Sequence, residues 1–232
     1  MCGRFNIISD PLTVLLMELV GLPHPGPDNF NAAPTETIEV LRLDESGEPE
    51  LVPMRWWLTP HWSKAPSTRY AMFNARSETA AKSPAFREPY RKRRCVVPVS
   101  GFYEWTRQNN QKLPYLLKPH EGPGLLLAGL WDRWQNPETE EELESITVLT
   151  VASSPAMALI HKRQPLMLSI EDARSWMDPE SEAFEALIRS ELPVALDAVP
   201  VSTHVNNARN KDERCMDPIG KPITLDDGGA LL

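Results

Sequence analysis

Residues 94–105, RCVVPVSGFYEW, decide the fold of this chain. From Cys95 to Val99 the side chains are almost all apolar and several are β-branched, which is typical of a buried strand. Gly101 then interrupts the run, and a glycine inside a strand pattern marks a bend or a break. The stretch therefore predicts a buried strand with a break at Gly101.

Further strands are predicted on both sides of this one. Residues 37–43 and 50–57 are largely apolar and are separated by the turn sequence DESGE, so together they predict a β-hairpin. A short extended segment is predicted at residues 3–8. Later apolar runs predict four more strands, at residues 113–118, 124–132, 146–152 and 196–202.

The helices are predicted to be short. The first runs from a cap at Asp10 to a stop at Gly21, because Asp accepts hydrogen bonds from free N–H groups and glycine readily ends a helix. Ser169, three residues before Asp172, resembles a capping box that opens a helix through Trp176. Short helices or turns are predicted at residues 74–81, 154–160 and 181–190, and loops at 22–35, 58–72 and 136–144.

The order of these elements predicts an α+β fold with mainly antiparallel strands. We find no internal repeat and no linker that would divide the chain. We therefore expect one domain over residues 1–225, followed by a frayed tail at residues 226–232.

Composition and charge narrow the class of protein. The chain has 232 residues, of which 41% are hydrophobic and 24% charged, as in a globular protein. The net charge is −8, but residues 1–120 carry 15 Lys and Arg against 12 Asp and Glu, whereas residues 121–232 carry 9 against 20. A basic surface should therefore draw on the first half, where the run RKRR lies at residues 91–94; the alternative for that run is a solvated face.

Neither a membrane span nor a signal peptide is visible. No apolar run approaches the roughly 20 residues that a span needs, and the start lacks a basic region followed by an apolar one. We expect a cytoplasmic protein. Cys2, Cys95 and Cys215 are widely spaced and form no CxxC pair, so we expect reduced thiols, with no disulfide and no metal site.

Cys2 stands directly after Met1. If Met1 is removed, the terminal residue presents an α-amine and a thiol on neighbouring carbons. The amine can form an imine with an aldehyde, and the sulfur can then close a five-membered thiazolidine. The same group can instead attack an amide as a nucleophile, and the alternative to both is an incidental cysteine near a terminus.

Four further positions carry chemistry suited to a polar, anionic substrate. Arg4 and Arg76 offer guanidinium groups that match phosphate, and Asn74 can donate and accept hydrogen bonds. Glu104 lies between aromatic residues, where burial would raise its pKa and make it a general acid or base; the alternative is a strand glutamate that faces solvent.

His161 follows a predicted short helix and precedes two cations, so we expect it in a loop. Histidine is the usual proton carrier near neutral pH, although a single histidine is also common as a structural residue. Trp62 belongs to a tryptophan-rich stretch, and exposed aromatic residues beside arginine can stack on unpaired bases. Core packing is the alternative for these tryptophans.

These motifs, in this order, resemble the SOS response-associated peptidase family, whose members process abasic sites. The resemblance runs from residue 1 to about residue 210. It rests on MCGRF at the start, Phe30-Asn31-Ala32-Ala33-Pro34-Thr35, the Trp56, Pro60 and Trp62 segment, Asn74-Ala75-Arg76-Ser77-Glu78-Thr79, Pro98 with Gly101-Phe102-Tyr103-Glu104-Trp105, and His161 with Arg163 and Pro165.

The resemblance implies a single α+β domain with a barrel-like antiparallel sheet and peripheral helices. It also implies a partner, single-stranded DNA with abasic sites, to which the protein crosslinks as a thiazolidine, and a thiol autopeptidase activity that removes Met1. The implied catalytic residues are Cys2, Asn74, Glu104 and His161. The predicted DNA contacts are Arg4, Asn31, Trp62, Arg76 and Arg163.

We expect no cofactor, no metal, no membrane association and a monomer. In the predicted mechanism His161 protonates the ring oxygen of the abasic sugar as it opens, and Glu104 moves protons to and from the amine of Cys2. Two other functions stay open, a cysteine peptidase acting in trans and a non-catalytic single-strand binder.

The chain departs from the family pattern at three positions. Trp57 and Asn206 stand where the family usually has glycine, and Gln164 stands where Met or Arg is frequent. We expect Trp57 to alter the backbone or the DNA groove, and Gln164 to lie close to the active site.

Overall fold

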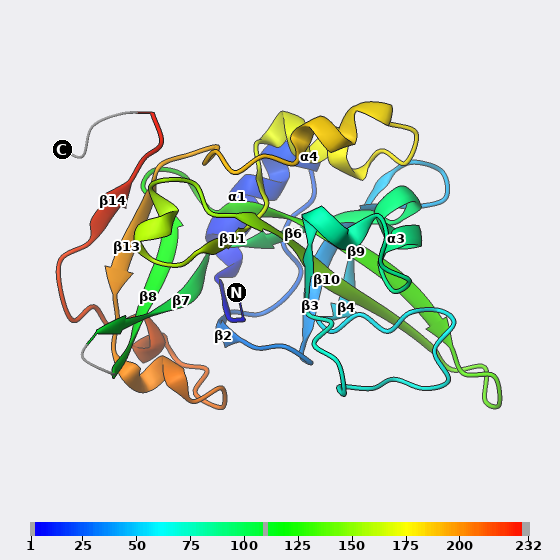
Figure 1. Ribbon diagram of the computed structural model, residues 1–232, viewed down its shortest axis with the longest axis horizontal. Helices are drawn as coiled ribbons and strands as arrows, with labels where there is room; N and C mark the ends of the chain where they lie inside the picture. Colours follow the sequence, from blue (N-terminus) through cyan, green and yellow to red (C-terminus); the bar gives the residue numbers. More distant parts are fainter. Residues whose placement is uncertain (1–2, 109–110, 229–232) are drawn as a thin grey trace.

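The stretch at residues 94–105 forms two strands in two different sheets, β6 (Arg94–Val99) and β7 (Gly101–Gln108) (Figure 1). The computed structural model describes residues 3–108 and 111–228. The single strand predicted here is therefore wrong, although its break is real. A Cβ at Gly101 would lie 2.6 Å from the carbonyl oxygen of Leu117, so only glycine fits where β7 begins against its neighbour.

The first sheet has six strands, all paired antiparallel, in the order β14-β13-β8-β7-β1-β2. Its other members are β1 (Phe5–Ile7), β2 (Asn29–Ala32), β8 (Gln111–Pro119), β13 (Leu196–Pro200) and β14 (Ile223–Leu225). β2 lies within the predicted loop at residues 22–35, which is a correction. Its pairing with β1, far away in sequence, makes it a strand.

The second sheet closes into a five-stranded barrel. β10 pairs with β4, β4 with β3, β3 with β6, β6 with β9, and β9 again with β10. The bounds are β3 (Thr37–Leu43), β4 (Pro49–Arg55), β9 (Leu125–Gln135) and β10 (Glu142–Ala152). Three short strands extend the barrel: β5 (Asn74–Arg76), β11 (Arg163–Pro165) and β12 (Met167–Leu168). Closure leaves these five strands few free edges, and the predicted α+β domain with a barrel-like sheet is confirmed.

Helix α1 (Ser9–Val20) starts one residue before the predicted cap. Asp10 lies in its first turn, and the Ser9 N–H is instead satisfied by the Asp28 carboxylate, 2.7 Å away. The predicted stop is correct, because Gly21 has φ +75° and ends the helix in the left-handed conformation. Residue 28 is too far along the chain for a local capping rule to identify.

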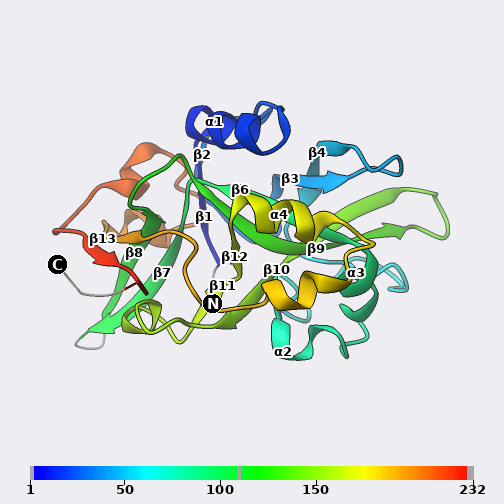
Figure 2. The ribbon, with the colours of Figure 1, turned by 90° about the horizontal axis from the view of Figure 1, so that it is seen from above.

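The other helices are short, and α4 lies over β6 and β9 (Figure 2). In α4 (Ile170–Met177) the Ser169 hydroxyl accepts from the Asp172 N–H, so the predicted cap is confirmed. The others are α2 (Ser77–Ala80), α3 (Arg87–Lys92) and the 3-10 helices η1 (Met157–Leu159), η2 (Glu182–Leu187), η3 (Thr203–Asn206) and η4 (Glu213–Met216). α3 was not predicted, and the helices expected at 154–160 and 181–190 are reduced to 3-10 turns.

The basic run at residues 91–94 is only partly a surface. Arg94 is 2% exposed and donates to the carbonyl oxygens of Trp176, Tyr90 and Arg91 at 2.7, 3.2 and 2.7 Å. It thus joins the carboxyl ends of α3 and α4. Arg93 pairs with the buried Asp132 at 3.0 Å. Only the first two cations of the run are exposed, so charge density in the sequence overstates the basic surface.

The structure describes two of the three cysteines and part of the predicted carboxy-terminal tail. Cys95 and Cys215 are free thiols, and both are buried, which the sequence did not predict; Cys2 lies outside the described residues. The tail is described as far as Gly228, and Asp227 in it accepts two backbone hydrogen bonds. No helix in the described part combines the length and apolar character that crossing a bilayer requires.

Candidate active site

Strand β1 lies in the first sheet, between β7 and β2, and also contacts β6 of the barrel (Figure 2). On one side it pairs with β7, with Phe5 opposite Phe102, and the Tyr103 N–H donates to the Arg4 carbonyl at 3.0 Å. On the other side the Phe5 ring stacks on Trp56, with centroids 3.9 Å apart and planes at 13°. The amino-terminal residues are therefore held by backbone pairing and by aromatic stacking at once.

Glu104 follows Tyr103 on β7 and is 2% exposed. This burial rules out the strand glutamate that faces solvent. Burial raises the pKa of the Glu104 carboxyl, while the nearby charge of His161 opposes the rise. A buried carboxyl beside an imidazole suits proton transfer. The structure therefore places Glu104 within range of the charge of His161, although 57 positions separate them in the sequence.

His161 lies in the loop between β10 and β11, as predicted. Its Nδ1 lies 3.1 Å from the Arg163 N–H, which can donate to it, and 3.0 Å from the Arg163 carbonyl oxygen, which can accept from it. The backbone of Arg163 can thus satisfy Nδ1 with or without a proton. These two backbone contacts hold the ring in its observed orientation.

Asn74 begins β5, so the short helix predicted within residues 74–81 starts later than expected, as α2 at Ser77. β5 runs parallel to β10, with Asn74 opposite Val148. The preceding residue, Phe73, accepts a hydrogen bond from Trp56 Nε1 at 2.9 Å. Because Trp56 also stacks on Phe5, one buried tryptophan links the start of the chain to the strand that carries Asn74. Trp56 was not singled out for this role, since its motif only marked a resemblance.

Arg163 is tied to its surroundings. Its guanidinium donates to both oxygens of Glu78 at 2.9 and 3.0 Å, and to the Thr150 carbonyl oxygen at 2.7 Å. Such a two-point pair fixes orientation as well as charge, and this one joins β11 to α2. Glu78 lies in the first turn of α2. Arg76 is exposed at the end of β5.

Arg4 and Asn31 meet beneath a second loop. Arg4 Nη1 donates to Asn31 Oδ1 and to the Val205 carbonyl oxygen, both at 2.9 Å, and burial lowers the pKa of Arg4. Asn31 is fully buried, and its amide donates to the carbonyls of Val205, Asn207 and Asn210 at 3.2, 3.1 and 2.9 Å. Asn31 thus anchors the loop at residues 205–210.

A cavity of about 360 Å³ opens beside Arg4. Gly3, Trp105, Lys112 and Asn206 complete its lining. Asn206, one of the departures from the family pattern, accepts from Trp105 Nε1 at 2.7 Å. The asparagine therefore orients the aromatic residue that follows Glu104, a contact that glycine cannot make.

The other two departures have equally specific contacts. The Trp57 ring lies 5.2 Å from the Phe73 ring. Its backbone needs no glycine, since the described non-glycine residues with positive φ are Thr35 and Glu140. Gln164 is 1% exposed, and both ends of its amide bond to backbone groups, so it serves the loop around it.

Trp62 is exposed and hydrogen-bonded to the backbone. Its side chain is among the exposed large hydrophobic ones, at 57%, and its Nε1 donates to the Pro84 carbonyl at 3.3 Å. The His61 N–H beside it donates to the buried Asp132 at 2.9 Å. An aromatic face held on the surface suits stacking on a base.

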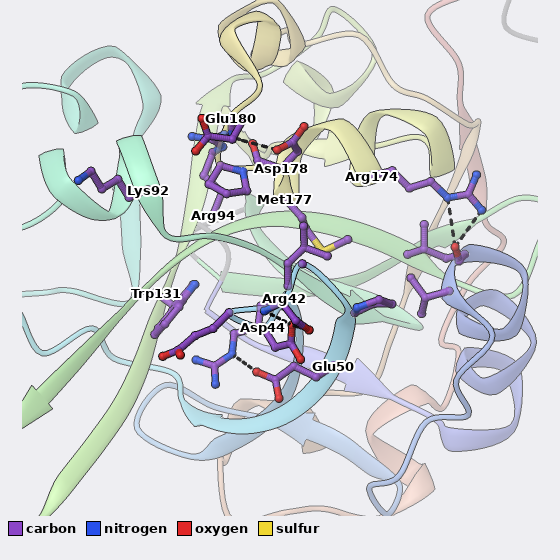
Figure 3. A pocket seen from close by; sticks show the side chains of 18 of the residues that line it. Arg42, Asp44, Glu50, Lys92, Arg94, Trp131, Arg174, Met177, Asp178 and Glu180 are labelled. Atoms are coloured by element: carbon purple, nitrogen blue, oxygen red, sulfur yellow. Dashed lines mark hydrogen bonds and ion pairs between the residues drawn. The ribbon is translucent and has the colours of Figure 1, made fainter.

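A larger cavity, of about 1020 Å³, lies between α1, α4 and the β3–β4 hairpin, and contains none of the predicted site residues (Figure 3). Its charges are mostly paired: Arg42 contacts Glu50 at 2.6 Å, and Arg174 donates to the Leu19 carbonyl at 2.8 Å. Among residues 3–108 and 111–228, no three His, Cys, Asp or Glu side chains gather as a metal site would require.

Comparison with known proteins adds to this geometry. A sequence model of the family "SOS response associated peptidase (SRAP)" matches residues 1–208. The chain is 31% identical to abasic site processing protein YoqW of Bacillus subtilis (strain 168), over 90% of this chain and 96% of that one. It is 36% identical to abasic site processing protein HMCES of Xenopus tropicalis, over 81% of this chain and 65% of that one.

Solved structures share the fold. An X-ray structure of a Bacteroides thetaiotaomicron protein superposes with a TM-score of 0.77 at 22% identity, covering 94% of this chain and all (100%) of that one. One from Bordetella bronchiseptica gives 0.75 at 23% identity, covering 87% and 100%. These two similarities concern architecture alone.

Proposed function

The chain belongs to the SOS response associated peptidase family, and from that premise we propose that it processes abasic sites in DNA. In this proposal the protein loses Met1, binds single-stranded DNA and crosslinks to the abasic sugar through the amine and thiol of Cys2. The relatives named as abasic site processing proteins support the substrate.

The observation that carries the proposal is the position of Glu104, which is buried, lies within range of the charge of His161, and stands on the strand that pairs with β1. Phe5 pairs with Phe102, and the Arg4 carbonyl with the Tyr103 N–H. One further step of this antiparallel register brings Gly3 to the level of Glu104. Cys2 is joined to Gly3 by one peptide unit, about 3.8 Å between Cα atoms, so a proton-transfer pair lies within reach of the terminal residue.

The proposed reaction has three steps. His161 protonates the ring oxygen as the abasic sugar opens to its aldehyde. The amine of Cys2 then attacks the aldehyde carbon, and loss of one water gives an imine, with Glu104 moving protons between amine and carbinol. Finally the Cys2 thiolate adds to the imine carbon and the nitrogen takes up a proton, which closes the thiazolidine. The net change is condensation with release of one water, without redox chemistry.

Removal of Met1 is the required first event, because an amide nitrogen cannot form the imine. We propose that this hydrolysis is the thiol autopeptidase activity: the Cys2 thiol attacks the Met1 carbonyl carbon, the C–N bond breaks to leave a thioester and the free α-amine, and water hydrolyses the thioester to release methionine. Asn74 orients the lesion or the adjacent phosphate from the start of β5.

DNA contacts are proposed for the cations and the aromatic residue around the site. Arg76 is exposed, whereas Arg4 and Arg163 already hold protein groups and would bind phosphate with donors not used in those bonds. Trp62 offers a fixed face for a base. Asn31, which is fully buried, acts through the loop that it anchors. Each phosphate contact strengthens binding at low salt and makes the affinity fall more steeply as the salt concentration rises.

The test is intact-mass measurement and a denaturing gel after incubation with single-stranded DNA that contains one abasic site. We expect the mass of the protein without Met1 plus DNA minus one water, and no such product from Cys2→Ala or with intact DNA. Cys215→Ala, which removes a buried thiol, is the matched control and should crosslink normally. A Cys2→Ala product with the mass of the variant without Met1 plus DNA minus one water would overturn the mechanism. Turnover of an added peptide would favour a peptidase in trans, and equal affinity for intact and abasic strands without adduct would favour a simple binder.

A further inference from the structure

The loop that carries His161 is closed by a side-chain bridge from Gln164. Residues 153–162 connect β10 to β11 and contain η1. Gln164 Oε1 accepts from the Ser154 N–H at 2.9 Å, and its Nε2 donates to the Ser190 carbonyl oxygen at 2.8 Å. One buried amide therefore joins the start of the loop to a segment that lies after η2.

Asp227 forms a second bridge beside the first. Its Oδ1 accepts from the Ala156 N–H at 3.2 Å, and its Oδ2 accepts from the Leu192 N–H at 3.0 Å. Both bridges thus connect the same two segments, residues 154–156 and 190–192. Asp227 lies beyond residue 208, where the match to the family ends, so this bridge comes from a part of the chain that the family pattern does not include.

Within the loop, hydrogen bonds between residues close in sequence connect the bridged residues to His161. The Met157 N–H donates to the Ser154 hydroxyl at 3.2 Å, and the His161 N–H donates to the Met157 carbonyl at 3.0 Å. The Ser153 hydroxyl donates to the His161 carbonyl at 2.6 Å. A shift of residues 154–156 would therefore move the histidine. Met157 is fully buried, so core packing keeps the loop folded if one bridge is lost.

We infer that Gln164 and Asp227 are positioning residues for His161: together they hold its loop against residues 190–192 and so place the imidazole beside Glu104. A carboxylate that accepts two backbone N–H groups holds them more strongly than a neutral acceptor does. Proton transfer depends steeply on distance, and a misplacement of about 1 Å can slow a reaction about a hundredfold. The inference rests on the role proposed above for His161.

The first test needs no DNA. Asp227→Ala removes the bridge, and Asp226→Ala is the matched control, because Asp226 is the exposed neighbour whose side chain accepts from Gly228 alone among the described residues. We expect hydrogen exchange at the Ala156 and Leu192 amides to accelerate about fivefold or more in Asp227→Ala, and the NMR signal of the His161 ring to shift. Asp226→Ala should change neither. Equal behaviour of the two variants would overturn the inference.

The second test measures the rate of crosslinking to abasic single-stranded DNA across pH. We expect Asp227→Ala to react about tenfold more slowly, with a displaced pH midpoint, while its affinity for intact single-stranded DNA stays within about twofold. Asp227→Asn, which keeps one oxygen acceptor, should recover part of the rate. A variant that is merely less stable would lose amplitude at an unchanged midpoint, and that result would contradict positioning.

Gln164→Met keeps a side chain of similar volume but removes both hydrogen bonds of the amide. It tests whether the two bridges hold the loop jointly. Because both join the same segments, the loss in the double variant Gln164→Met/Asp227→Ala should be smaller than the product of the single losses; simple multiplication would contradict a shared role. If the wild type forms no crosslink, or if His161→Ala reacts at the wild-type rate, the proposed function is wrong. In either case the hydrogen-exchange and NMR comparison still shows whether Asp227 holds the loop that carries His161.

Discussion

Trp56 links the start of the chain to Asn74, so a mild change at this residue should affect the reaction more than it affects folding. Its ring is fully buried against Phe5, and its Nε1 bonds to the Phe73 carbonyl. Trp56→Phe keeps an aromatic ring on Phe5 but removes the donor and shrinks the side chain. The Phe73 carbonyl still accepts from the Val148 N–H at 3.1 Å, so it is not left unsatisfied.

The expected loss of stability follows from two contributions. The substitution removes about 40 Å³ of side chain, which at about 24 cal/mol per Å³ of residual cavity destabilises the fold by about 1 kcal/mol. The lost hydrogen bond contributes about 1 kcal/mol more. We expect urea unfolding to show a free energy of unfolding about 2 kcal/mol below the wild type. The crosslinking rate should fall threefold to tenfold, roughly, because β1 and β5 lose their shared anchor.

Trp176→Phe is the control that separates an effect on the alignment of β1 and β5 from a general loss of stability. Trp176 is also fully buried, and its Nε1 donates to the Cys95 carbonyl at 3.0 Å, but its ring packs against Phe184, on α4's side of the barrel. It should lose a similar free energy of unfolding and keep the wild-type crosslinking rate. If Trp176→Phe slows crosslinking as much as Trp56→Phe does, the link from Phe5 to Asn74 has no special role and the reasoning fails.

Two further predictions concern residues beside the reaction. Because burial raises the pKa of Glu104, the folded protein keeps this proton to a higher pH than the unfolded chain, so Glu104 lowers stability as pH rises above about 4.5. Glu104→Gln should therefore unfold at higher urea than the wild type at neutral pH, show no such gain below pH 4.5 and crosslink more slowly; an equal gain at every pH would contradict this account. Asn206→Gly removes the acceptor for Trp105 Nε1. It should leave the free energy of unfolding within about 1 kcal/mol, and increase the mobility of the Trp105 indole, measured by fluorescence anisotropy. Unchanged anisotropy would show that Asn206 does not hold the ring.

Local sequence patterns predicted much of the secondary structure. Alternation and β-branching identify most of the long strands, and the Ser169 cap was found because its acceptor and donor lie three residues apart. The candidate residues came from short motifs and from the resemblance that they carry. These signals succeed because a strand's pattern, a cap or a motif is contained within a few consecutive residues.

Only the tertiary structure decided what these residues contact. Residues 94–105 read as one strand, but packing places β6 in the barrel and β7 beside the amino terminus. Glu104 could have faced solvent, and burial beside His161 excludes that. The bridges from Gln164 and Asp227 join segments with no pattern in common. Such contacts depend on barrel closure and sheet order, which are set by packing summed over the whole chain. By itself, the sequence identified Cys2 as the reactive candidate, whereas the fold decided that β1, which follows it, pairs with β7, the strand that carries the buried Glu104.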